Sequence, residues 1–153
     1  VAINADGSVI AIGAGKNDGA GIDSGHLRVF ELESGTWIQR GDDIDGKKSG
    51  YEFGKTLSLS MDGNVVASGS IFDSSRAGHA QIYEWKTTSW VQKGADIIGE
   101  IFGDDSGSAV SLSGNGNVIA VGATNSRVGG EAVGHVRIFE FITPSPTAAP
   151  TSS

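Results

Sequence analysis

The chain carries one sequence pattern three times. The segments "VAINADGSVIAIGA" (1–14), "LSLSMDGNVVASGS" (57–70) and "VSLSGNGNVIAVGA" (110–123) align without gaps. A second pattern, "GHLRVFE", begins at Gly25 and returns in altered form 53 and then 109 residues later. Such a period indicates that each copy is one structural unit and that neighbouring copies stack to bury a shared core. The sequence therefore predicts a repeat protein.

Each unit reads as four short antiparallel strands. Strand one alternates Leu or Val with Ser, and the alternation has the period of a strand. Asp62-Gly63 or Asn115-Gly116 follows, and these pairs predict a two-residue hairpin turn of type I′. The "GHLRVFE" segment and the following "TWIQRG" form a second hairpin. No segment shows a helical period.

Side-chain size increases from strand one to strand four. The first two strands carry Ser, Ala, Val, Ile and Gly, the third carries Phe30 or Tyr83, and the fourth carries Trp37 or Trp90. Slim strands fit a common hub, and bulky strands fill the widening space between radial sheets. The sequence therefore predicts an all-β fold of β-propeller blades, four-stranded antiparallel repeats of about 53–56 residues, as a partial propeller of roughly three blades.

The repeat boundaries divide the chain into propeller repeats and a tail. We expect propeller repeats over 1–142, incomplete at both ends, followed by a Pro/Ser/Thr-rich linker at 143–153. The expected blades are blade 1 at about 1–41, blade 2 at about 42–94 and blade 3 at about 95–142. A closed propeller typically has four to eight blades. We therefore expect this chain to be a segment of a longer propeller, with a shared ring or an open array as the alternatives.

These residues resemble the FG-GAP, integrin-α-like propeller repeats, in the degenerate form found in large secreted proteins of marine microbes and algae. The resemblance rests on Phe53-Gly54, "AIGA" (11–14), "GHLRVFE" and the pattern W-x-Q-x-G-x-D-I that begins at Trp37 and again at Trp90, and it covers residues 1–142. It implies an extracellular propeller with a role in adhesion. The third repeat departs from it, with Ser106-Gly107 in place of Phe-Gly. The family's calcium loop is not carried over, because the expected two-residue turn leaves no room for it.

Composition excludes several classes of partner. The chain has 18 Asp and Glu against 11 Lys and Arg, a net charge of −7, and no basic cluster, so we predict no nucleic-acid binding. No apolar run is long enough for a membrane span, so we predict no membrane insertion. The chain has no cysteine, and a thiolate metal site is excluded.

The antiparallel order places the loops between strands two and three at the same end as the connections between blades. Twelve acids fall in these segments, and we expect them to form one acidic loop face: Asp18, Asp23, Asp42, Asp43, Asp45, Glu52, Asp73, Asp96, Glu100, Asp104, Asp105 and Glu131. Calcium prefers flexible loops rich in oxygen ligands. We therefore regard Ca²⁺ as a candidate ligand, with Asp43 and Asp45 of "GDDIDG" (41–46), Asp18 and Asp23 as candidate metal ligands. Protein or glycan partners are expected at the same face.

We find no sequence signature of catalysis. The three histidines occupy one repeat position, too far apart on neighbouring blades to share an ion, and we interpret them as structural. No nucleophile motif or metalloprotease motif is present, so we predict no catalytic residue, no further cofactor and no enzyme activity.

The sequence thus favours a non-catalytic extracellular or cell-surface scaffold or adhesion module that binds partners through its acidic loop face, with calcium as a candidate ligand. Two alternatives stay open. One is a carbohydrate-binding or hydrolytic propeller. The other is a structural subunit of a larger fibre or complex, in which remaining blades or other chains cover the open blade edges.

Overall fold

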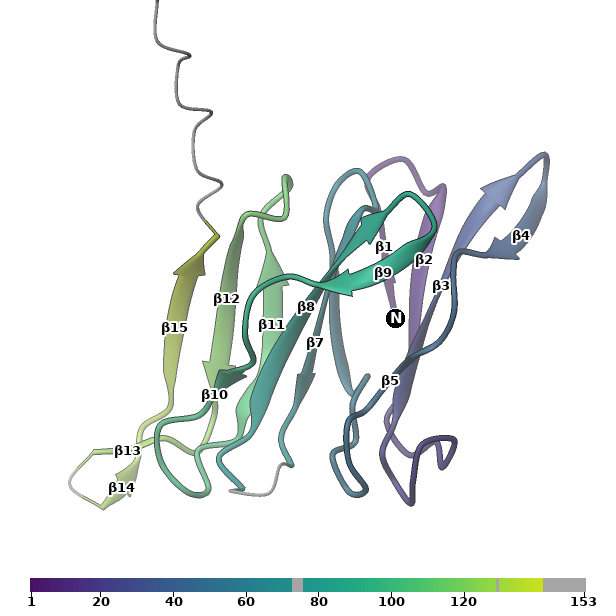
Figure 1. The fold of residues 1–153 in the computed structure, drawn as a ribbon. Helices are drawn as coiled ribbons and strands as arrows, with labels where there is room; N and C mark the ends of the chain where they lie inside the picture. The colour runs from purple at the N-terminus through teal and green to yellow at the C-terminus, as the bar shows by residue number, and fades with distance from the viewer. Residues whose placement is uncertain (73–75, 129, 142–153) are drawn as a thin grey trace, which may run out of the picture.

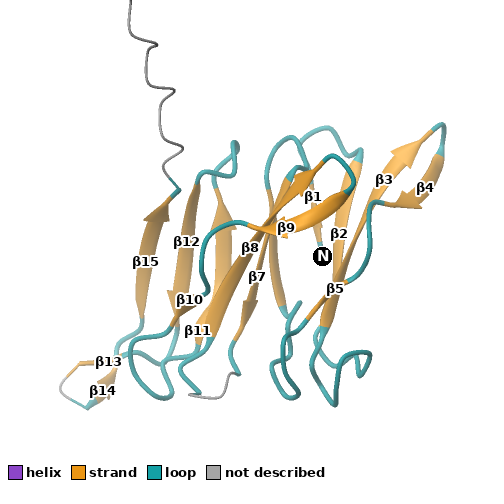
Figure 2. Cartoon of the chain, viewed as in Figure 1, coloured by secondary structure: helices purple, strands orange, loops and turns teal. Residues whose placement is uncertain are grey.

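The computed structural model describes residues 1–72, 76–128 and 130–141, and within these ranges every regular element is a strand (Figure 1, Figure 2). No helix in this part of the chain is long and apolar enough to cross a membrane. The strands are β1 (Ala2–Ile3), β2 (Val9–Ala14), β3 (His26–Glu33), β4 (Thr36–Gln39), β5 (Ile44–Asp45), β6 (Thr56–Leu59), β7 (Val65–Ser70), β8 (His79–Lys86), β9 (Ser89–Gln92), β10 (Ile97–Ile98), β11 (Ser106–Leu112), β12 (Val118–Ala123), β13 (Arg127–Val128), β14 (Glu131–Ala132) and β15 (His135–Glu140).

The main strands form three antiparallel sheets. The first sheet has the order β1-β2-β3-β4 and the second has β6-β7-β8-β9, while the described part of the third has β11-β12-β15. The expected all-β fold of antiparallel repeats is therefore confirmed. The expected linker at 143–153 lies outside the described residues.

The sheets lie side by side and bury one hydrophobic core in each of the two spaces between them (Figure 1). The space between the first and second sheets contains Val9, Ala11, Leu27, Val29, Ile44, Phe53, Val66 and Tyr83, with Leu57, Leu59 and Trp90 packed against them. The space between the second and third contains Val65, Ala67, Ala80, Ile82, Ile97, Ile119 and Val121, with Val110, Leu112, Phe139 and Phe141 packed against them. Because side chains alternate between faces along a strand, the middle sheet supplies residues to both cores.

In the first and second sheets, the slim strands and the tryptophan strands lie at opposite edges, as predicted. Strand β6 contacts β1 and β11 of the neighbouring sheets, whereas Trp37 and Trp90 lie on the far-edge strands β4 and β9. Glycine permits the close approach, because a Cβ at Gly13 would overlap the carbonyl oxygen of Gly54, just before β6, and a Cβ at Gly69 would overlap that of Gly107 on β11. The two partner glycines belong to the Phe53-Gly54 and Ser106-Gly107 pairs, which occupy the same repeat position. The close approach therefore requires the glycine of the pair and not a phenylalanine before it.

The predicted hairpins between the first two strands of each unit are present, but the predicted type I′ turn is wrong. In a type I′ turn both central residues have positive φ, whereas here Gly63 has φ of 71° and Asp62 is not among the residues with positive φ. The amide of Gly63 donates to the Ser60 carbonyl at 3.0 Å, which closes a turn with the glycine at its last position. The Asp62 carboxylate accepts from the Ser60 hydroxyl and the Asn64 amide, so it is used inside the turn.

The outer edge of each complete sheet is broken into two short strands, a feature that the sequence analysis did not anticipate. Strand β3 pairs first with β5 and then with β4, and β8 pairs likewise with β10 and β9. The side chains of Ile44 and Ile97 are buried and hold β5 and β10, respectively, in place. The first sheet thus extends to Asp45 and the second to Ile98, beyond the blade boundaries expected near residues 41 and 94.

Candidate functional site

The connections that carry most of the acids lie at one end of the stacked sheets, the lower end in Figure 1. Not all of these acids are available for a partner. Asp104 is buried and accepts from the backbone amides of Glu100 and Ile101, so it stabilises its own turn. Asp73 of the expected acidic face lies outside the described residues.

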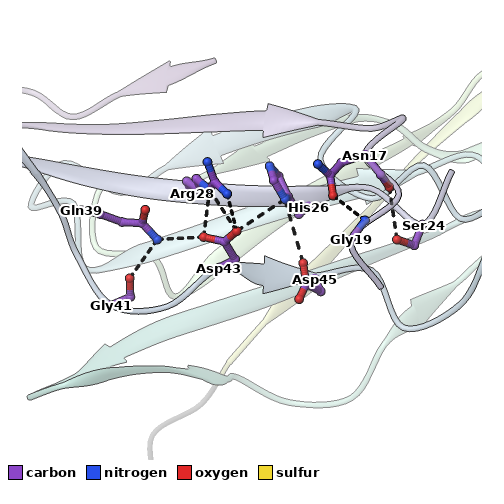
Figure 3. A network of polar contacts seen from close by, with 9 residues as sticks. All are labelled: Asn17, Gly19, Ser24, His26, Arg28, Gln39, Gly41, Asp43 and Asp45. Atoms are coloured by element: carbon purple, nitrogen blue, oxygen red, sulfur yellow. Dashed lines mark hydrogen bonds and ion pairs between the residues drawn. The ribbon is translucent and has the colours of Figure 1, made fainter. Parts of the chain in front are cut away.

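The four candidate metal ligands do not form one group. Asp18 lies in the β2–β3 connection, where its carboxylate accepts from the backbone amide of Asp23 at 2.9 Å. Asp43 lies at the break between β4 and β5, and Asp45 lies on β5, close to His26 at the start of β3 (Figure 3). Among the described residues, His26, Asp43 and Asp45 are the one set of three or more His, Cys, Asp or Glu side chains whose ligand atoms lie within 4.8 Å of one another.

The geometry of this cluster centres on the Asp43 carboxylate. The Nδ1 atom of His26 lies 3.6 Å from Asp43 and 4.0 Å from Asp45. Arg28, the next residue on the same side of β3, donates to both oxygens of Asp43 at 2.8–2.9 Å, and Gln39 donates to it at 2.8 Å (Figure 3). Hydrogen bonds from the Arg28 guanidinium hold the pKa of Asp43 below its ordinary value, and the bond from Gln39 adds to this. Asp43 is therefore a firmly ionised carboxylate with its oxygens already engaged.

The same arrangement recurs in the second sheet with different partners. Asp96 occupies the repeat position of Asp43 and accepts from Gln81 at 2.9 Å and from Gln92 at 2.6 Å. Lys47 adds an ion pair at 2.8 Å from the connection that follows the first sheet. Burial raises the pKa of Asp96, but hydrogen bonds from Lys47, Gln81 and Gln92 outweigh it and lower that pKa overall. The recurrence indicates that this aspartate holds together the broken outer edge in the first and second sheets.

The cluster is a poor match to calcium as it is arranged. Calcium takes six to eight oxygen ligands, whereas this cluster offers one imidazole nitrogen and two carboxylates, one of which is already bound to Arg28. An ion at this position would require Arg28 to release Asp43. Calcium binding therefore stays a prediction.

A groove of about 280 Å³ opens beside the cluster, between the β4–β5 break of the first sheet and strands β8 and β9 of the second. Its lining combines three carboxylates with two aromatic rings: Asp42, Asp43, Ile44, Asp45, Tyr83, Ser89 and Trp90. Burial, with the nearby charge of Asp96 as a smaller cause, raises the pKa of Tyr83 to about 12, so its hydroxyl stays neutral. The groove can attract a cationic group and offer it an aromatic surface.

The three acids of this groove have no full counterpart in the second sheet. Ala95 stands at the repeat position of Asp42, and Ile98 stands at that of Asp45. Asp42 and Asp45 are exposed, in contrast to Asp43. A shared structural role explains Asp43 and Asp96, but it does not explain Asp42 and Asp45. These two carboxylates are therefore the strongest candidates for contact with a partner.

The sequence alone indicates only the acidic part of the groove lining. The sequence identifies the acids of "GDDIDG" as candidates, but Tyr83 and Trp90 come from the next repeat and reach the groove because the sheets stack. The sequence does contain one indication of the groove. Asp42 and Asp45 are acidic, whereas Ala95 and Ile98 stand at the same positions of the next repeat. His26 and His79 are buried at the starts of β3 and β8, and the structural interpretation of the three histidines stays a prediction.

No protein-family model matches the chain, and no curated protein matches it. Among solved structures the chain is similar to TolB from Acinetobacter baumannii, with a TM-score of 0.51 and 17% sequence identity. The match covers 92% of this chain but only 29% of the TolB chain. At this identity the likeness concerns the fold alone, and the resemblance to FG-GAP repeats stays a prediction. The chain has a β-propeller-like, all-β antiparallel fold.

Proposed function

We propose that this chain is a non-catalytic scaffold that binds a protein partner through the groove formed by Asp42, Asp45 and Trp90. The observation that carries the proposal is the pair of exposed carboxylates beside an aromatic ring, present at the first groove and not repeated in the second sheet. The matching partner feature is a lysine or arginine side chain, because its charge pairs with carboxylates and its alkyl or guanidinium part packs on an indole. We place the scaffold outside the cell, which is supported by the resemblance to repeats of secreted proteins.

The state of the carboxylates supports binding rather than catalysis. A general acid that works near neutral pH needs a raised pKa, usually from burial. The pKa of Asp43 is instead lowered by Arg28, and Asp42 and Asp45 are exposed to solvent. Asp43 is therefore suited to constant negative charge and not to proton transfer.

The test is a calorimetric titration of the chain with a hexa-arginine peptide at low ionic strength. We expect the double variant Asp42→Asn/Asp45→Asn to bind the peptide up to about thirtyfold more weakly, since two exposed ion pairs contribute up to about 1 kcal/mol each. The matched control is Asp18→Asn/Asp23→Asn, which removes the same charge from the β2–β3 connection and should bind almost as the wild type does.

Equal losses in the two double variants would mean that the peptide responds to net charge alone, and the groove proposal would then be abandoned. The titration is repeated with added Ca²⁺ and with a chelator, so that any contribution of calcium to the same loop is measured directly.

A carbohydrate is the second candidate partner, because Trp90 and Tyr83 line the same groove and sugars stack on aromatic rings. Salt separates the two candidates. Pairing with a basic side chain weakens as ionic strength rises, whereas stacking of a neutral sugar does not. Binding of a neutral glycan on an array that persists at high salt would favour the carbohydrate over the basic protein partner.

A further inference from the structure

The two outer sheets each present an apolar face that has no neighbour within the described chain. The first-sheet end face consists of Ile3, Ile10, Ile12, Phe30 and Trp37, and the third-sheet end face consists of Val118, Ala120, Val136 and Ile138. Ile138 is 72% exposed and Val136 is 65% exposed. Such exposure is unusual for two branched apolar side chains that are neighbours on the same face of one strand. Exposed apolar patches of this kind mark interaction surfaces.

The third-sheet end face repeats a surface that is buried elsewhere in the molecule. Its residues occupy the repeat positions of buried residues in the second sheet, which are Val65, Ala67, Ala80 and Ile82. Ile82 and Ala80 are 0% exposed because the third sheet covers them. The repeat pattern thus gives Ile138 and Val136 the same side-chain chemistry and the same strand register as residues that make a joint between sheets.

The first-sheet end face repeats the opposite half of the same joint. Ile3, Ile10 and Phe30 occupy the repeat positions of residues by which the second sheet packs on the first, which are Leu59, Val66 and Tyr83. The third sheet packs on the second through residues at those positions as well, which are Leu112, Ile119 and Phe139. Ile3 is nevertheless 59% exposed. The chain therefore carries one half of the joint at each end.

The two halves face away from each other at opposite ends of the stack (Figure 1). They cannot meet within the described part of one molecule, but they can meet between two. We propose that the third-sheet end face of one copy of this chain docks on the first-sheet end face of a second copy, in the packing that joins consecutive sheets inside the chain.

Such a contact joins two different surfaces and leaves one of each kind unused at the ends. It is therefore a head-to-tail interface, which continues into a ring if the rotation closes and into an open filament if it does not. The intermolecular joint lacks one contact of the internal joint. Inside the chain, the indole of Trp90 donates to the Arg40 carbonyl of the preceding sheet at 2.7 Å, whereas the described part of the third sheet offers no outer strand to Trp37. We expect a reversible association that depends on concentration.

The proposal concerns surfaces away from the acidic groove and does not rest on the proposed function. Its test is sedimentation velocity of the full chain over a wide concentration range, with the variants Ile3→Asp and Ile138→Asp, each of which places a charge on one end face only. Both side chains are exposed in the monomer, so the variants should fold, and circular dichroism checks this. Ile12→Asp, on the first-sheet end face, replaces Ile3→Asp if that variant unfolds.

We expect the mass of the wild type to rise with concentration, to that of a dimer if two copies close a ring of six sheets and beyond it if the array stays open. Each variant alone should sediment as a monomer. An equimolar mixture of the two variants should form a one-to-one dimer and nothing larger, because it contains one intact face of each kind. A wild type that stays monomeric, a single variant that still dimerises, or a mixture that stays monomeric would each overturn the proposal.

Discussion

Substitution of Gly69 by alanine tests how closely the second and third sheets approach. Gly69 lies on β7, and an added Cβ would overlap the carbonyl oxygen of Gly107 in the next sheet. Since the obstacle is backbone, it moves only if the two sheets separate locally. Overpacking of this kind costs about 1–3 kcal/mol, and we expect the upper part of that range. For a domain of this length, a loss of about 3 kcal/mol lowers the melting temperature by roughly 6–12 °C.

The repeat supplies a matched control at Gly122, which occupies the same position in the third sheet. There the nearest atom to an added Cβ is the Ala109 side chain of the same sheet at 3.4 Å, an ordinary contact. Gly122→Ala should therefore be neutral or stabilise the chain by up to about 1 kcal/mol, because alanine has less freedom to lose than glycine. Both variants are melted by far-ultraviolet circular dichroism at a concentration where the chain is monomeric. Equal melting temperatures would refute the close approach of the second and third sheets.

Two further variants test single contacts of the fold. Arg40 donates to the Gly63 carbonyl at 3.2 Å and to the Asn64 side chain at 2.6 Å, so Arg40→Ala should lower the free energy of unfolding by about 1.5–3 kcal/mol, as measured in urea. Arg40→Lys should retain most of this stability, because Lys93 makes the equivalent contacts with Gly116 and Asn117 in the next repeat. A loss of stability as large as that of Arg40→Ala would contradict the role of these contacts. Asp96→Asn should reduce stability most above pH 3.8, the ordinary pKa, because the lowered pKa of Asp96 means that its ionised form stabilises the fold. The difference from the wild type should shrink as the pH falls through that lowered pKa, and a difference that does not change with pH would exclude this role.

The repeat made the strands and their order predictable because sequence periodicity and strand geometry are both local. The slim edge formed by β6 and the tryptophan edge formed by β9 followed from side-chain size. The turn at Gly63 was predicted wrongly, because Asp-Gly is compatible with more than one turn and the Asp62 carboxylate, bonded to Ser60, favours the longer one. The break between β4 and β5 was missed, because a two-residue strand held by one buried isoleucine has no period of its own.

The candidate site was less predictable than the fold, because its contacts join residues far apart in sequence. The sequence identified Asp43 and Asp45 as acidic loop residues. It could not show that Arg28 would engage Asp43, since that depends on the side of β3 that faces the β4–β5 break. Nor could it show that Trp90 of the next repeat would line the groove, since that depends on how the sheets stack.

The most direct test of stacked sheets is a methyl nuclear Overhauser measurement on the labelled chain. Stacked sheets predict cross-peaks from Val9 to methyls of the second sheet such as Val66, and equivalent cross-peaks from Val65 to methyls of the third sheet such as Ile119. Cross-peaks that join Val9 directly to Ile119 would instead place the first and third sheets face to face, and they would contradict the sequential stacking on which every joint described above is built.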